Sequence, residues 1–163
     1  MQSDNDDQTM CNVKAVSFIP LFVQLAIEFN SFRNEERGGL LVEDDNGNTV
    51  LHYLVCSPHS SYDDCKEHHE LVDTAFVAVL IRLRRSGYLV KEDIQQYDLV
   101  YRLCRKQQFS KHRFRRLIEW DPSSLLIAFS VTEQCRCLPL HWVADNLQAF
   151  QVVLDCLFRY YPR

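Results

Sequence analysis

The spacing of apolar residues predicts helices through most of the chain. From Phe18 to about Arg33, apolar residues recur at steps of three and four, which is typical of an amphipathic helix. These residues are Phe18, Leu21, Phe22, Leu25, Ala26 and Phe29. A second stripe of this kind lies within 71–85, at Val72, Ala75, Phe76, Val79, Leu80 and Leu83. We expect both stripes to face a core, with the helix at 18–33 as the first packed element.

Two segments lack this periodicity. Residues 1–12 are almost all polar and carry three aspartates, so we expect a flexible acidic tail before a folded domain over 13–163. Residues 57–70 are also polar and contain Pro58. They separate a short predicted helix at 49–56 from the long one at 71–85, and therefore form a polar insertion.

Composition agrees with an all-α protein. The chain has 163 residues, 47% of them hydrophobic, which is enough for one core. Four glycines and five prolines are few for a β-sandwich with its frequent turns. Neither a secretory signal nor an apolar run long enough for a membrane span occurs, so the sequence predicts an intracellular protein, most simply a cytoplasmic one, that does not enter the membrane. Seven cysteines without regular spacing favour reduced thiols over disulfides.

Two short segments share a further pattern. They are Gly47-Asn48-Thr49-Val50-Leu51-His52 and Leu138-Pro139-Leu140-His141-Trp142-Val143-Ala144. Each resembles the Thr-Pro-Leu-His-x-Ala signature that opens the first helix of an ankyrin repeat. In that signature Thr caps the helix, Pro suits its first turn, Leu enters the core and His bonds to neighbouring backbone. The matching residues are Thr49, Leu51, His52, Pro139, Leu140 and His141, while Val50 replaces Pro in the first copy and Leu138 replaces Thr in the second.

The ankyrin resemblance implies a solenoid of helix-turn-helix repeats. A weaker middle unit aligns Leu99-Val100-Tyr101 with Leu51-His52-Tyr53 and Leu140-His141-Trp142. The spacings of 48 (99 − 51) and 41 (140 − 99) exceed the usual ankyrin period of about 33. The middle unit also lacks the signature's Thr, Pro and His, so HEAT-like helical repeats stay open as an alternative. Residues 40–47 correspond to the strand-and-turn connector, with Gly47 at positive φ, and Ser110 is a predicted N-cap.

The resemblance also implies a binding mode. Ankyrin stacks bind protein partners through a concave face made by the connector tips and the exposed ends of the first helices. The corresponding positions are Asp45, Asn46, Asn48, Cys56, Ser57, Gln134, Cys137, Asp145 and Asn146. We therefore predict a protein-interaction module, although the sequence does not indicate which protein it binds.

The middle of the chain is basic and offers an alternative ligand. Residues 82–116 carry 11 basic and 3 acidic side chains, a net charge of +8, against −4 for the whole chain. A patch there would suit nucleic acid or an acidic partner. Its members would be Arg82, Arg84, Arg85, Arg102, Arg105, Lys106, Lys111, Arg113, Arg115 and Arg116. Solvated faces of amphipathic helices explain such runs more simply, and nucleic-acid binding is the weaker prediction.

The polar insertion holds a second alternative. Cys56, His59, Cys65 and His68, with His69 beside them, supply two thiols and two imidazoles, the ligand set of structural zinc. Solvated loop histidines are the simpler interpretation.

Signatures of catalysis are absent from the sequence. It has no Gly-rich phosphate loop, no Gly-x-Ser-x-Gly elbow and no His-Glu-x-x-His. His52 and His141 could be named as general bases, but their place in the repeat signature favours a structural role. We therefore predict neither an enzyme nor a cofactor.

Overall fold

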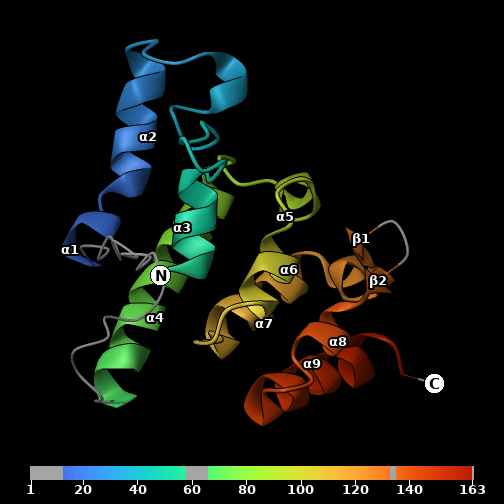
Figure 1. The fold of residues 1–163 in the computed structure, drawn as a ribbon. Coiled ribbons are helices and arrows are strands. Elements are labelled where there is room, and N and C mark those ends of the chain that lie inside the picture. Colours follow the sequence, from blue (N-terminus) through green and yellow to red (C-terminus); the bar gives the residue numbers. More distant parts are fainter. Residues whose placement is uncertain (1–12, 58–65, 133–134, 163) are drawn as a thin grey trace, which may run out of the picture.

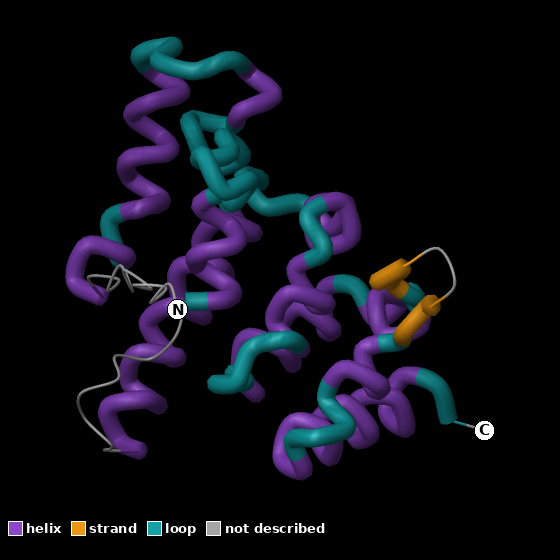
Figure 2. The backbone as a smooth tube through the Cα atoms, viewed as in Figure 1, coloured by secondary structure: helices purple, strands orange, loops and turns teal. Residues whose placement is uncertain are grey.

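Helices dominate the described residues, 13–57, 66–132 and 135–162, in the computed structural model of the chain (Figure 1 and Figure 2). The α-helices are α1 (Val13–Val16), α2 (Ile19–Glu28), α3 (Val50–Cys56), α4 (Lys66–Arg85), α5 (Lys91–Gln96), α6 (Leu99–Cys104), α7 (Lys111–Trp120), α8 (Pro139–Trp142) and α9 (Leu147–Tyr160). Short 3-10 helices lie at η1 (Asn34–Glu36) and η2 (Pro122–Leu126). The prediction of a mainly helical fold is confirmed, and none of the described helices is long and apolar enough to cross a bilayer.

A small hairpin departs from the all-helical prediction. Strand β1 (Phe129–Thr132) pairs antiparallel with β2 (Cys135–Cys137), and Phe129 lies opposite Cys137. The register is irregular between Ser130 and Thr132. This hairpin belongs to the connector that precedes α8.

The helices are arranged in two rows. Helices α3, α6 and α8 contact one another in sequence and form one row, while α4, α7 and α9 form the other. Each short helix also contacts the longer helix that follows it, which gives the pairs α3/α4, α6/α7 and α8/α9. Figure 1 shows these pairs side by side in chain order, from the blue end to the red end. The helices predicted at 49–56 and 71–85 overlap α3 and α4, the first pair, whereas α5 and η2 in the connectors were not predicted.

The core lies between the two rows. Apolar side chains from both rows are fully covered, including Leu51, Leu54, Phe76, Leu80, Leu83, Leu99, Leu103, Phe114, Leu117 and Val153. Most of the stripe predicted within 71–85 is buried, with Ala75 half-buried. The long helix begins earlier than predicted, at Lys66, so the last residues of the predicted insertion 57–70 belong to α4.

Helix boundaries follow local capping. The hydroxyl of Thr49 accepts the His52 N–H at the start of α3, and that of Ser110 accepts the Arg113 N–H at 3.1 Å at the start of α7. Both predicted caps are confirmed. The connector at 40–47 consists of turns rather than the predicted strand, and Gly47 has the expected positive φ of 70°. There the Asp44 carboxylate accepts the N–H groups of Asn46 and Asn48, which closes a tight turn.

The prediction for the helix at 18–33 was wrong in its length and in its buried face. The helix ends at Glu28, because Asn30 takes a left-handed φ of 49°. Pro20 and Val23 are its buried residues, and α4 is its main helical neighbour. The predicted core stripe is largely exposed instead. The reason is that α2 carries apolar residues on both sides, so periodicity alone could not select the side that packs.

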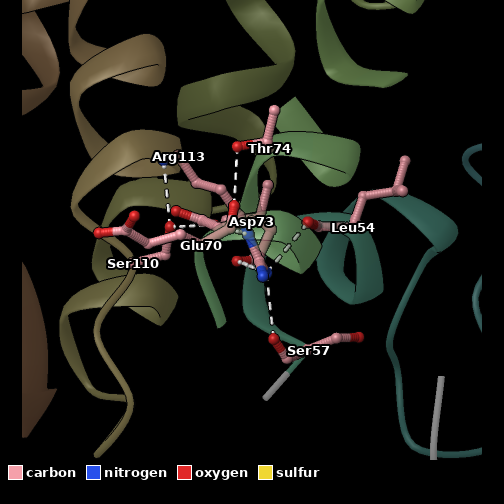
Figure 3. A network of polar contacts seen from close by, with 8 residues as sticks. Leu54, Ser57, Glu70, Asp73, Thr74, Ser110 and Arg113 are labelled. Atoms are coloured by element: carbon pink, nitrogen blue, oxygen red, sulfur yellow. Dashed lines mark hydrogen bonds and ion pairs between the residues drawn. The ribbon is translucent and has the colours of Figure 1, made fainter. Parts of the chain in front are cut away.

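A buried ion pair ties the first two helical pairs together (Figure 3). Arg113 of α7 is 1% exposed, and its Nε atom lies 2.7 Å from Oδ1 of Asp73 in α4. Its Nη1 atom donates to the carbonyls of Leu54, Val55 and Ser57 at 3.0–3.3 Å. These carbonyls lie at the C-terminal end of α3, so one guanidinium satisfies a helix end that would otherwise be buried without partners.

Candidate protein-interaction face

The first signature forms the junction between two helical pairs. The Thr49 N–H donates to Nδ1 of His52 at 2.8 Å, so Nε2 carries the proton and donates to the Tyr97 carbonyl at 2.8 Å. Burial lowers the pKa of His52, which keeps the ring neutral. Both ring nitrogens are occupied by backbone groups. His52 is thus placed as the resemblance implied, and it has no free nitrogen with which to act as a general base.

The second signature repeats only half of this arrangement. The Leu138 N–H donates to Nδ1 of His141 at 3.0 Å, and Pro139 is buried in the first turn of α8. His141 itself is exposed, and its Nε2 atom has no hydrogen-bond partner among the described residues. The bond that His52 makes to a following unit therefore has no counterpart here.

The residue after the histidine position is aromatic in all three first helices. These residues are Tyr53 in α3, Tyr101 in α6 and Trp142 in α8. Tyr101 stacks on Phe129 of β1 with ring centroids 4.6 Å apart, and meets Trp142 edge-on at 5.1 Å. Tyr53 is nearly half-exposed, and its hydroxyl donates to the Asp44 carboxylate. That bond lowers the pKa of Asp44 and raises the pKa of Tyr53.

Arg102 of α6 and Arg105, the residue that follows the helix, extend this aromatic line. The Arg105 guanidinium lies 5.6 Å from the centroid of the Tyr101 ring and 5.4 Å from that of the Trp142 ring. Arg102 donates to the Asn48 side chain at 2.8 Å and so connects α6 to the first connector turn. The three aligned aromatics and these two arginines are called the first-helix face below.

A cleft of about 580 Å³ opens beside this face. It lies between the end of α6 and the start of α9, and its lining includes Arg105, Lys106, Trp142, Asp145 and Asn146. Asp145 and Asn146 are two of the predicted contact residues. The cleft therefore brings them together with Arg105 and Lys106, two members of the predicted basic patch, and with the ring of Trp142, which was not predicted to bind.

The remaining predicted contact residues differ in accessibility. Asp45 and Asn46 are exposed at the first connector turn, and Asn48 is half-buried against Arg102. Cys137 is half-buried on β2, and Gln134 lies outside the described residues.

Two of the predicted contacts point to the interior instead. Ser57 is buried, and Cys56 is half-buried, with burial raising the pKa of its thiol to about 11. Neither residue is well placed for a partner, because the end of α3 is covered by Arg113.

The signal for the missed residues was present in the sequence. Aligning the three first helices places Tyr53, Tyr101 and Trp142 at one position, and a large aromatic recurring at one repeat position is a pattern that can be read without a structure. Arg102 and Arg105 had been predicted only as members of the basic patch, and nothing in that basic segment distinguished them from the other arginines.

The basic segment 82–116 does not act as one surface. Arg113 is buried on Asp73, so its predicted place in a surface patch was wrong. Arg84 donates to the Leu89 carbonyl and Arg116 pairs with Glu119. The exposed members are spread over α4, α7 and the loop after α6. Nucleic-acid binding through this segment remains a prediction without structural support.

The zinc prediction concerns residues that the structure describes only in part. His59 and Cys65 lie outside the described residues, and the side chain of His68 is not described. Among the side chains that are described, no three of the ligand types His, Cys, Asp and Glu gather as a metal site. The four-ligand site stays a prediction.

Comparisons with protein-family models, curated proteins and solved structures find no significant match to this chain.

Proposed function

We propose that the chain is a stack of helical hairpins, similar to an ankyrin-repeat domain, that binds a protein partner along its first-helix face. The two rows of helices support the stacking, because each short-long pair contacts the next pair through both rows. The His52 bridge to Tyr97 supports the ankyrin-like character of the first junction.

The observation that carries the proposal is the composition of the first-helix face. Tyr, Trp and Arg are the residues most enriched at binding hot spots, because they combine a large apolar surface with hydrogen-bonding groups. Tyr53, which is nearly half-exposed, and Tyr101 and Trp142, which are half-buried, supply that surface from three successive units, and Arg105 lies over the rings of Tyr101 and Trp142. Contacts between these side chains reduce the side-chain freedom that binding would otherwise remove.

The charges near the cleft define the chemistry of the partner. Arg105 and Lys106 line the cleft and are exposed, so they favour carboxylates on the incoming chain. Asp45 at the first connector turn and Asp145 at the cleft favour basic side chains. A peptide segment with an acidic end, a basic end and apolar residues between them would match these charges. Its acidic end would meet Arg105 and Lys106 at the cleft, and its basic end would meet Asp45.

Selection from a random peptide library on the folded protein tests this proposal. Selected peptides should lose at least about tenfold in affinity on Arg105→Glu and on the double change Asp45→Arg with Asp145→Arg. Arg115→Glu is the matched control, since Arg115 is exposed on α7 in the other row and its change should leave affinity intact. Each variant must first show the thermal unfolding of the parent protein.

Two outcomes would count against the proposal. One is a library that yields no binder. The other is a set of binders whose affinity ignores the first-helix changes but falls with Arg115→Glu, which would move the interaction to the second row of helices.

A further inference from the structure

Helix α2 has apolar side chains on two opposite sides. Pro20 and Val23 are the buried residues of the helix. On the other side, the stripe of Phe18, Leu21, Phe22, Leu25, Phe29 and Phe32 is exposed, with Phe22 at 64% and Phe29 at 76%. A helix that is apolar all round is normally buried on every side. This stripe is called the α2 outer face.

Helix α9 repeats this arrangement at the other end of the chain. Its inner side buries Ala149, Val152, Val153 and Cys156. A second stripe, with steps of seven, four and three residues, comprises Leu147, Leu154, Phe158 and Tyr161, and Leu147 and Phe158 are 80% and 67% exposed. This stripe is called the α9 outer face.

The two outer faces lie at opposite ends of one row of helices, formed by α2, α4, α7 and α9. Helix α2 contacts α4, α4 contacts α7 and α7 contacts α9, and Figure 1 shows α2 and α9 at opposite ends of the molecule. Inside the row, apolar helix faces meet in pairs. At each end the row presents another such face that no described helix covers.

The exposed apolar areas approach the size of a specific contact, and the α2 outer face is the larger of the two. Taking about 200 Å² for each exposed aromatic or leucine residue, the α2 outer face offers roughly 600 Å². A specific interface of standard size buries about 800 Å² on each partner. Exposed apolar patches of several hundred Å² on a monomer mark interaction sites.

A second observation concerns α8, the helix that pairs with α9 at the same end of the stack. In the first unit, Nε2 of His52 bonds to the Tyr97 carbonyl just before the second unit. In the last unit, the corresponding nitrogen of His141 has no partner among the described residues. Both the apolar stripe and this donor are features that a further helical layer would cover.

We infer that copies of this chain associate head to tail, with the α9 outer face of one copy packed on the α2 outer face of the next. This contact continues the row with the same kind of apolar helix pairing that joins α4 to α7. Because the two faces differ, the association is heterologous and can extend beyond a dimer. It uses the ends of the row and leaves the first-helix face free, so it does not depend on the proposed function.

The experiment is sedimentation velocity with the full chain, from low to high micromolar concentration. The parent protein should show a mass that rises with concentration past that of a dimer. Phe22→Asp blocks the α2 outer face and Phe158→Asp blocks the α9 outer face. Each variant alone should associate at least about tenfold more weakly, because every contact needs one face of each kind.

Mixing the two variants gives the decisive result. Phe22→Asp keeps an intact α9 outer face and Phe158→Asp keeps an intact α2 outer face, so the mixture should form dimers with one copy of each and nothing larger. Arg115→Asp, an exposed change on α7 that replaces none of the outer-face residues, should behave as the parent protein. Unchanged circular dichroism and melting temperature in each variant show that folding is intact.

Two results would overturn the inference. A parent protein that stays monomeric at the highest concentration would show that the outer faces do not bind each other. Self-association that is lost in Phe22→Asp but kept in Phe158→Asp would show symmetric pairing through α2 alone.

Discussion

The Nε2 atom of His52 lies 2.8 Å from the carbonyl oxygen of Tyr97, and this bond joins the first helical pair to the segment that begins the second. The other nitrogen of the ring accepts the Thr49 N–H at the start of α3. One neutral imidazole thus accepts a hydrogen bond at the N-terminus of α3 and donates another across the junction between units. His141, in the same position of the last unit, makes only the bond at the helix start within the described part of the chain.

The two histidines should therefore differ in their contribution to stability. His52→Ala leaves two buried backbone groups unpaired and should lower the free energy of unfolding by about 1–3 kcal/mol. His141→Ala removes one bond at an exposed site and should cost about 1 kcal/mol or less. Urea denaturation of both variants measures the difference. Equal losses would mean that the bond to Tyr97 adds nothing to stability.

Acidification should weaken the same junction. Burial lowers the pKa of His52 below its ordinary value of 6.5, so the folded protein binds this proton less readily than the unfolded chain does. The contribution of His52 is complete above the unfolded pKa and declines as the pH falls from about 6.5 toward the lower pKa of the folded state.

Denaturation at a series of pH values from about 7 to 5 tests this effect. The free energy of unfolding of the parent protein should fall over this range, and His52→Gln should flatten part of that decline. His141→Gln changes the exposed histidine at the same repeat position and serves as the comparison variant. A His52→Gln slope as steep as that of the parent would refute the assignment.

The buried pair of Arg113 and Asp73 should be the most sensitive polar contact in the fold. Asp73→Asn leaves the Arg113 guanidinium buried without its counter-charge and should cost about 3–5 kcal/mol. Arg113→Lys should be nearly as damaging, because an ammonium cannot reach both Asp73 and the carbonyls at the end of α3.

A surface pair supplies the comparison for that prediction. Arg116 and Glu119 form an ion pair on α7 with both side chains more than one third exposed. Glu119→Gln should change stability by less than about 1 kcal/mol. Thermal and urea unfolding of the three variants decide the matter, and similar losses for Asp73→Asn and Glu119→Gln would contradict the role given to the buried pair.

Local signals in the sequence were sufficient for the capped starts of α3 and α7. Thr49 and Ser110 cap helices through bonds to residues three positions away, so their role depends only on neighbouring sequence. Gly47 likewise lies in a turn closed within a few residues. The short-long order of the helices followed from apolar spacing of the same short range.

Features set by distant contacts could not be predicted. Arg113 lies in a basic run typical of a solvated surface, and its burial depends on Asp73, 40 residues earlier. The outer face of α2 looked like a core stripe because its apolar spacing is the same as that of a buried face. Its exposure depends on which side α4 contacts, and that is decided by the rest of the fold.

Two glycines with similar backbone angles should respond differently to alanine. Gly38 has φ of 64°, and a Cβ atom there would lie 2.4 Å from the Val23 carbonyl oxygen in α2. Gly47 has φ of 70°, and a Cβ atom there would meet nothing within 4 Å. Gly47→Ala should cost about 1 kcal/mol from the backbone angle alone, and Gly38→Ala at least about 2 kcal/mol, because α2 must also shift. Equal melting temperatures for the two variants would show that α2 is not held at Gly38.

The predicted zinc site can be separated from a purely apolar role of Cys56. Cys56 is half-buried and packs against the core at the end of α3, as an apolar residue does. We therefore expect protein purified without chelator to contain less than about a tenth of an equivalent of zinc by elemental analysis. Cys104 is the matched control, since its thiol is also buried, with a pKa raised to about 12. Cys56→Ala and Cys104→Ala should then lose similar amounts of stability and show the same zinc content. Stoichiometric zinc that is lost in Cys56→Ala but retained in Cys104→Ala would instead establish the site formed with His59, Cys65 and His68.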